Sequence, residues 1–270
     1  MQKEQIIRLA FFIGSLLIIA LWELIAPRRQ LTDSKPRRWF TNLFLVLLNT
    51  AAVRYFLPIL PVGMALMLHE RGWGILNTLV LPDWLKIVTA VLVLDLVIYL
   101  QHVLFHFLPT LWRLHRMHHV DLDIDVTTGN RFHPIEIVIS IGIKLAAVAL
   151  LGPPVIAVII FEVVLNASAQ FNHGNIRIPE PFDRILRLFV VTPDMHRVHH
   201  SVIPSETNSN FGFNVPWWDR LFGTYRAQPE RGHLGMMIGL KEYRDPAKLS
   251  LGRLLLLPFM KNRFKSARPK

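Results

Sequence analysis

The sequence contains the same histidine pattern twice. "HRMHH" occupies residues 115–119, and "HRVHH" occupies residues 196–200. Upstream of both, His102 and His106 form a third set with a spacing of four residues. Residues three and four apart share one face of a helix, so each set can direct its imidazoles toward one point. Convergent imidazoles are typical of a metal site.

The number of these histidines suits more than one metal ion. One ion takes about four to six ligands, so eight or nine imidazoles indicate two ions. His173, in "FNHGN", is the ninth candidate. The full set of candidate ligands is His102, His106, His115, His118, His119, His173, His196, His199 and His200. The chain has no cysteine, which excludes thiolate zinc sites and cysteine-ligated iron–sulfur clusters.

The ligand type alone does not choose the metal. Imidazole binds iron, zinc and copper alike. The setting is informative, because a two-metal centre at a membrane surface suggests oxidation of an acyl chain or ring. Zinc has no redox chemistry with which to attack such unactivated C–H bonds.

The other histidines have simpler interpretations. A lone histidine is usually a surface or hydrogen-bonded residue, and we expect this for His69 and His233. His133, in "RFHPIE", precedes a proline at a membrane edge, and we expect a structural role there more readily than a ligand role.

Asp95 is the first candidate for orienting a ligand. It lies seven residues before His102, about two helical turns, and therefore on the same face. A carboxylate inside a membrane helix is by default a functional hypothesis. The alternative is an ion pair with Lys86 or Arg54 that serves packing alone.

Three further polar residues flank the histidine sets. Asp121, Asp194 and Asn172 can orient imidazoles in the same way. A solvated turn or a helix cap is an equally good interpretation for each of them.

The composition indicates a membrane protein. Of the 270 residues, 52% are hydrophobic and 18% are charged, below the roughly one quarter of soluble domains. The net charge of +11 fits anionic lipid headgroups and positive cytoplasmic loops. Several membrane crossings argue against nucleic acid as a partner.

Four hydrophobic runs define the expected crossings. The first, 6–26, suits one crossing of about 20 residues and has no signal-peptide cleavage site after it. The second, 39–68, contains Pro58 and Pro61, which should kink or end its helix. The third is 84–108. The fourth, 135–171, is split by Gly152-Pro153-Pro154 and is predicted to be a helical hairpin.

The basic segment 28–38 follows the first run and predicts a cytoplasmic loop, with the N-terminus outside. The stretch 69–84 is too short to span and is expected at the outer surface or as a re-entrant piece. Both HxxHH sets then fall on the cytoplasmic side.

The predicted fold is all-α: an integral membrane protein with about four transmembrane helical elements and a cytoplasmic helical cap that carries a histidine-rich di-metal site. Residues 1–83 are expected to hold the N-terminal transmembrane helices and the outer-surface segment, 84–228 the histidine-box catalytic domain, and 229–270 a basic cytoplasmic tail. The end of the tail, 261–270, has five positive and no negative residues, which favours docking to anionic lipid over a solvated end.

The order HxxxH, HxxHH, HxxHH resembles the fatty acid hydroxylase/sterol desaturase superfamily of membrane di-iron enzymes. Three other stretches are similar to the same family. They are "DLVIYLQHVLFH" at 95–106, "NRFHPIE" at 130–136 and "NFGFNVPWWDRLFGTYR" at 210–226. The resemblance covers about half the chain, from Leu94 to Arg226.

The resemblance implies a non-haem di-iron oxidoreductase that uses O2 to hydroxylate or desaturate a fatty acyl, sterol or related lipid. It implies that the eight box histidines are ligands, and His173 is similar to an additional family histidine. No cytochrome b5-like "HPGG" motif occurs, so we expect a separate electron-transfer protein or reductase. We expect the active site on the cytoplasmic side of a bacterial inner membrane.

Several alternatives stay open at this point. One is an ether-lipid monooxygenase of the same superfamily, and another is a non-enzymatic metal-binding or transport protein of the membrane. A bis-histidine haem protein is disfavoured, because adjacent histidine pairs are wasteful for axial ligation. A zinc protease is disfavoured because no HExxH motif occurs.

Overall fold

The computed structural model describes residues 2–260, and the expected lipid-docking end of the tail, 261–270, lies outside the described residues. The described chain is helical, with two isolated β-bridges. Its longer helices are α1 (Gln2–Ile25), α2 (Lys35–Phe56), α3 (Pro61–Arg71), α5 (Asp83–Phe107), α6 (Pro109–His119), α7 (Pro134–Leu151) and α8 (Val155–Asn172). The shorter ones are α4 (Ile75–Thr78), η1 (Thr128–Asn130), α9 (Glu180–Leu186), α10 (Pro193–His199), α11 (Pro204–Thr207), α12 (Trp217–Leu221), α13 (Gly232–Gly235), η2 (Pro246–Lys248), α14 (Leu251–Leu256) and η3 (Leu257–Phe259).

The long helices are apolar enough to cross a membrane. Five stretches qualify by length and composition, and they correspond to the predicted runs when the hairpin is counted as two helices. They are Glu4–Ile25, Lys35–Thr78, Asp83–Phe107, Pro134–Leu151 and Val155–Asn172. The prediction of an all-α membrane protein is thereby confirmed.

Prolines and glycine end these helices where the sequence predicts. The second run breaks between Phe56, where α2 ends, and Pro61, where α3 begins. Gly152 ends α7 in the left-handed conformation, with φ of 58°. A Cβ at this position would lie 2.4 Å from the carbonyl oxygen of Trp73, so only glycine fits the hairpin turn.

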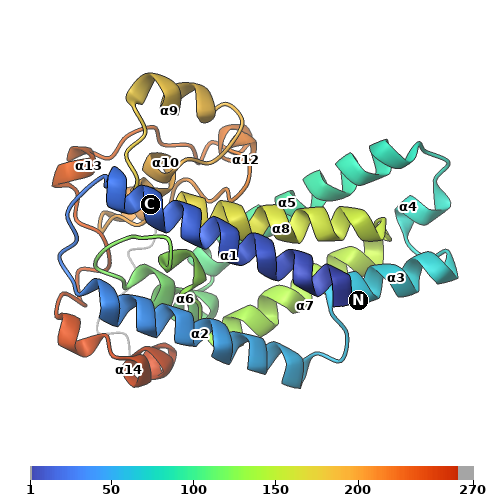
Figure 1. The fold of residues 1–270 in the computed structure, drawn as a ribbon, viewed down its shortest axis with the longest axis horizontal. Coiled ribbons are helices and arrows are strands. Elements are labelled where there is room, and N and C mark those ends of the chain that lie inside the picture. The colour runs from blue at the N-terminus through green and yellow to red at the C-terminus, as the bar shows by residue number, and fades with distance from the viewer. Residues whose placement is uncertain (1, 261–270) are drawn as a thin grey trace.

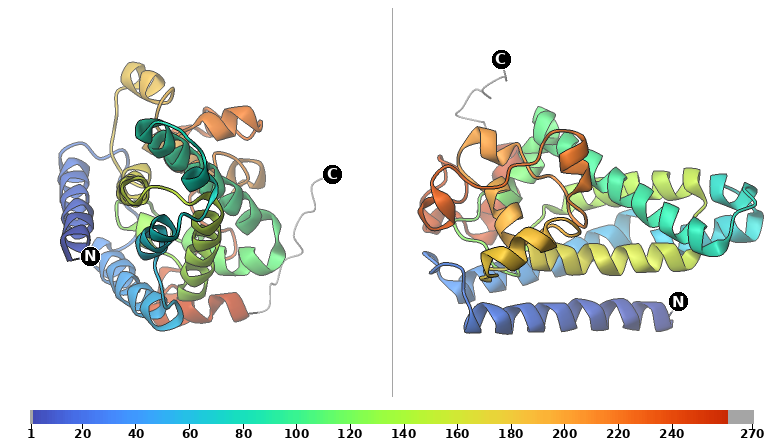
Figure 2. Two further views of the ribbon diagram at one scale, coloured as in Figure 1. Left: turned by 90° about the vertical axis from the view of Figure 1, so that its right-hand side faces the viewer. Right: turned by 90° about the horizontal axis from the view of Figure 1, so that it is seen from above.

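The long helices run side by side, and the short helices other than α4 gather at one end (Figure 1). We call this end the cap; it comprises residues 109–133 and 173–260. The core of the membrane part joins α5, α7 and α8 through Leu94, Val148 and Phe161. Helix α1 lies along the side of the bundle and packs mainly on α8 (Figure 2).

Charged side chains fasten α1 to the hairpin inside the membrane part. Glu162 of α8 accepts from Lys144 of α7 at 3.2 Å and pairs with Arg8 of α1 at 3.1 Å. Such intramembrane charges are tolerated when they neutralise one another, and this cluster joins three helices.

Another buried ionic network holds the cap to α2. The Arg38 guanidinium donates to both carboxylate oxygens of Asp121, at 2.9 and 3.0 Å, and to Asp125 at 2.6 Å. All three side chains are at most 2% exposed. This network fixes the loop that follows α6, the helix of the "HRMHH" set. Helix α2, which carries none of the clustered histidines, therefore helps to position α6.

The C-terminal part of the described chain also packs on the bundle. Leu254 of α14 and Leu257 of η3 share a core cluster with Leu45 of α2 and Met117 of α6. Within 229–260, the segment expected to be a basic tail therefore contributes helices to the cap.

We predict that Arg38→Met destabilises the protein by about 3–5 kcal/mol, because it removes the cation bound to buried Asp125 and leaves buried Asp121 with only the more distant Arg131, at 3.7 Å. Thermal unfolding in detergent should show a clearly lower Tm. Arg37→Met is the matched control, because the Arg37 side chain is 44% exposed and pairs with Asp33 at the surface. Equal Tm values for the two variants would contradict this role of the network.

Candidate metal centre

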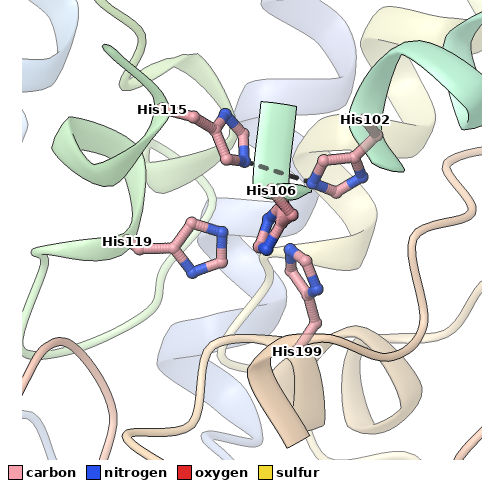
Figure 3. Close-up of side chains that lie close together, drawn as sticks. All are labelled: His102, His106, His115, His119 and His199. Atoms are coloured by element: carbon pink, nitrogen blue, oxygen red, sulfur yellow. Dashed lines mark hydrogen bonds between the residues drawn. The ribbon is translucent and has the colours of Figure 1, made fainter. Parts of the chain in front are cut away.

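The predicted histidines meet where α5, α6, α8 and α10 converge on the cap. They form two groups, and in each group the ligand atoms lie within 4.8 Å of one another. The first group is His102, His106, His115, His119 and His199 (Figure 3). The second group is His118, His173, His196 and His200. All nine candidate ligands of the sequence analysis are therefore brought together.

Each HxxHH set divides between the two groups, so the expectation that one set aims at one point is wrong. The i and i+4 members go together and the i+3 member goes to the other group. The reason is helical geometry. Neighbours such as His118 and His119 are rotated by about 100° around the helix axis, whereas i and i+4 differ by only about 40°. Two sets with this pattern supply both groups at once.

Prolines place these histidines on short, well-defined helices. Pro109 begins α6 directly after α5, with Leu108 as the single residue between them. Pro193 begins α10, whose N-cap Thr192 accepts a hydrogen bond from the backbone of Met195. His173 follows α8 as its C-cap residue.

Backbone carbonyls fix the tautomer of three ligands. The bonds run from His102 Nδ1 to Phe211 O (2.7 Å), from His199 Nδ1 to Ser209 O (2.8 Å) and from His173 Nδ1 to Ala169 O (2.6 Å). A carbonyl oxygen only accepts, so each Nδ1 carries the proton. Each Nε2 therefore keeps its lone pair for the centre, as in metal-bound histidine.

Two side chains do the same for other ligands. Glu136 Oε1 accepts from His115 Nδ1 at 2.6 Å, and Asn208 Oδ1 lies 3.2 Å from His106 Nδ1. Sequence reasoning missed both residues. Glu136 stands in the "NRFHPIE" stretch, three residues after His133, and this placement was the available signal. Asn208 carried none.

The spacing of the ring nitrogens fits bound cations. His102 Nε2 and His115 Nε2 are 3.2 Å apart although both bear lone pairs, which repel unless a cation lies between them. Imidazole nitrogens about 2.1 Å from a shared ion are separated by about 3.0–3.4 Å. In the second group, His173 Nε2 lies 3.1–3.2 Å from three other Nε2 atoms, and one lone pair cannot accept from all of them.

The imidazoles are held neutral. Burial lowers the pKa of His115 to about 3 and that of His173 to about 4. Burial, reinforced by neighbouring imidazoles, also lowers the pKa of His118 and His119 well below the usual value. Neutral imidazole is the form that binds metal. His119 is buried with neither ring nitrogen hydrogen-bonded within residues 2–260, and a metal ion would provide that partner.

Aromatic rings line the two groups. Phe132 stacks on His118 with ring centroids 4.5 Å apart and an interplanar angle of 8°. Phe211 packs edge-on against His102, His106 and His199. These apolar contacts restrict water and fix the ring orientations.

The arginines inside the two repeats anchor the helices that carry the histidines. Arg197 pairs with Asp194 and donates to the carbonyl of Gly174 at 3.2 Å, which ties α10 to the residue after His173. Arg28 binds the same carboxylate at 3.0 Å. Burial would raise the pKa of Asp194, but Arg197 and Arg28 lower it overall. Arg116 bonds the carbonyl of Leu257 and so secures the C-terminal helices.

Asp95 contacts no imidazole in the described part of the chain. Its carboxylate accepts from Trp218 Nε1 at 2.8 Å, and it forms no ion pair with Lys86 or Arg54 within residues 2–260. Its role in orienting a ligand stays a prediction. The contact that is present fastens α12 to the middle of α5.

The remaining candidates have structural partners. Asp121 binds Arg38, and Asn172 Nδ2 donates to the carbonyl of Phe213 at 2.7 Å. His133 caps α7, with its Nδ1 accepting from the backbone of Ile135. His69 is exposed, as expected. His233 is buried beside Asp194, with 3.6 Å between Nε2 and Oδ2, and therefore does not lie at the surface.

A model of one protein family matches residues 87–224, more than half of the chain and all nine histidines; its description is "Fatty acid hydroxylase". The chain belongs to this family. The match begins inside α5 and ends just after α12, so α1 to α4 and the C-terminal helices lie outside it.

Individual relatives agree with the family assignment. Ornithine lipid hydroxylase OlsE of Rhizobium tropici is 28% identical over 81% of this chain and 66% of its own length. Alkylglycerol monooxygenase of Homo sapiens is 26% identical over 62% of this chain and 36% of its own length, and that of Danio rerio is 30% identical over 54% and 32%. The chain thus spans just under two thirds of the hydroxylase and about a third of the monooxygenases. No solved structure matches.

We predict that Glu136→Leu weakens metal binding about 10–100-fold, because His115 loses the acceptor that fixes its tautomer. Glu136→Gln should retain most of the affinity, since its amide oxygen can still accept the hydrogen bond. Titration of metal-loaded protein with a chelator measures both. If Glu136→Leu lost its metal only at the chelator concentrations that remove metal from the wild type, this role of Glu136 would be ruled out.

Proposed function

We propose that this protein is a membrane di-iron monooxygenase that hydroxylates the hydrocarbon part of a polar membrane lipid. The observation that carries the proposal is the pair of all-histidine groups at the cap end of membrane-crossing helices, in a member of the fatty acid hydroxylase family. Neutral ligands leave the full positive charge on each ion. Zinc, which such ligands would also bind, could not oxidise a C–H bond.

Iron ions bound there would supply the activation of O2. The overall reaction inserts one oxygen atom into a C–H bond and reduces the other to water, which requires two electrons and two protons. A separate reductase or electron-transfer protein would deliver the electrons. The chain's own residues hold the imidazoles neutral, set their tautomers through Nδ1, and exclude water through Phe132 and Phe211.

The class of lipid follows from the relatives. One relative is named for ornithine lipids and others for alkylglycerols. We propose an amino-acid-linked lipid as the first substrate to test. The relative named for ornithine lipids matches a larger share of this chain than the alkylglycerol monooxygenases do. Cleavage of an ether lipid is the second candidate, favoured by the alkylglycerol monooxygenases.

The side of the membrane is part of the proposal. Arg28 and Arg29 lie between α1 and α2, and Lys35, Arg37 and Arg38 lie in the first turn of α2, all at the cap end of the molecule. Such a positive loop favours the cytoplasmic side. We therefore propose a cytoplasmic active site, in a bacterial inner membrane.

We predict that His118→Ala and His119→Ala each lower the metal content from about two irons per chain to about one. The reason is that each substitution removes a ligand from a different group. The double variant should hold little iron. Exposed His69→Ala is the control and should keep the wild-type content. Metal analysis with Mössbauer spectroscopy on protein from iron-enriched growth measures this. Protein that still holds only zinc after reconstitution with ferrous iron, or protein that holds one haem, would contradict the di-iron proposal.

We predict that cells expressing the protein with ornithine lipid present accumulate a lipid heavier by one oxygen atom, which comes from isotopically labelled O2. The His118→Ala strain should lack this product. Mass spectrometry of the lipid extract separates the outcomes: loss of two hydrogens would indicate desaturation, and release of an aldehyde would indicate ether cleavage.

A further inference from the structure

A group of large apolar side chains is exposed on the cap, although this region follows the last membrane-crossing helix. Helix α9 and its following turn carry Phe182, Ile185 and Phe189, and α12 and its C-cap carry Trp217, Leu221 and Phe222. These six side chains are between 44% and 69% exposed. We call them the α9–α12 surface. Contiguous apolar exposure of this kind marks a surface that contacts a partner or a membrane.

The two elements form one unit. Trp217 Nε1 donates to the carbonyl of Leu188 at 2.8 Å, and Arg220 donates to the carbonyl of Arg187 at 3.2 Å. Both bonds join α12 to the turn after α9. Within α9, Phe182 and Ile185 follow the spacing i, i+3, which places them on one face, and Phe189 stands in the turn that follows.

This unit is attached to a membrane-crossing helix at mid-length. Trp218 Nε1 binds Asp95, the central residue of α5, and Thr224 lies 2.9 Å from the Tyr99 hydroxyl. The Tyr99 ring also stacks on Phe222, with centroids 5.5 Å apart. Leu100, beside Tyr99, is exposed on the same helix. Helix α12 is therefore attached to α5 next to an exposed apolar residue of that helix.

The position along the bundle agrees with this attachment. In Figure 1, neither α9 nor α12 lies beyond the end of α1: α12 is level with the middle of α1, and α9 is level with its last turns. At that level α1 exposes Leu24 and Ile25, both more than 70%. Lipid that covers these residues would reach the α9–α12 surface as well.

We propose that the α9–α12 surface is inserted into the leaflet on the cap side, so that the cap is partly sunk in the bilayer. Aromatic rings and an apolar helical face are typical of elements that lie in the membrane interface. Exposed Arg220 lies on this unit and exposed Arg177 lies three residues before α9, and both suit anionic headgroups, whereas exposed Arg184 pairs with Glu180. The inference is independent of the proposed reaction, because depth in the membrane requires neither metal nor turnover.

Spin labels test this proposal directly. The chain has no cysteine, so single cysteines label one site each. Ile185→Cys and Leu221→Cys report on the surface in nanodiscs of phosphatidylethanolamine and phosphatidylglycerol. Ile18→Cys on α1 is the lipid-facing reference, and Leu234→Cys on α13, at the far end of the cap in Figure 1, is the water-facing reference. Both reference positions are more than 65% exposed.

Collision rates with oxygen and with a water-soluble nickel complex decide the outcome. We expect a several-fold higher ratio of oxygen to nickel collisions at Ile185 and Leu221 than at Leu234, close to the ratio at Ile18. A ratio equal to that at Leu234 would overturn the proposal and place the surface in water. Labels shielded from both reagents, with dipolar coupling between chains, would overturn it in favour of a second copy of the chain. Thermal unfolding of each labelled variant verifies that the fold is retained.

Discussion

The burial of nine imidazoles in one place is the constraint on which the cap depends. A buried polar group without a partner is costly. Several ring nitrogens of these histidines have no hydrogen-bond partner among the described residues. The acceptors that do exist are used at Nδ1, on the outer side, which leaves bare Nε2 atoms close together on the inner side. The surrounding protein therefore holds several lone pairs at distances that are unfavourable without cations. We therefore expect metal binding and folding of the cap to be coupled.

Charged networks outside the histidines balance this constraint. Arg38 fixes the loop after α6 through Asp121, whose pKa is lowered to about 2 because the arginines outweigh the effect of burial. Asp194 fixes α10 through Arg28 and Arg197. Each network links a histidine-bearing segment to the N-terminal part of the chain, which lies outside the matched family region. Helix α2 and the segment between α1 and α2 thus contribute to the geometry of the histidine groups through Arg38 and Arg28.

The sequence was sufficient to identify the histidines that converge and the membrane helices, but not how these histidines divide between the two groups. Histidine spacing and hydrophobic length are local properties, so the nine histidines and the spans were predicted. The division of each HxxHH set depends on where α5, α8 and α10 stand around α6, which is a tertiary property. Glu136 and Asn208 escaped prediction because a single polar residue far from its partner in sequence has no periodic signal. The exposed α9–α12 residues were overlooked because the region is polar on average.

The depth of the histidine groups relative to the bilayer connects these features. His106 lies one residue before the end of α5, and His173 directly follows α8, so both groups are built at the ends of membrane-crossing helices. Polar ligands placed deeper would be expensive in hydrocarbon, whereas a site far out in water would require a lipid to leave the bilayer. A cap that is partly sunk through the α9–α12 surface resolves this conflict, because it keeps the ligands in a polar, protein-filled layer. A hydrocarbon chain can then approach the groups from the leaflet, while the aromatic rings around them keep water out.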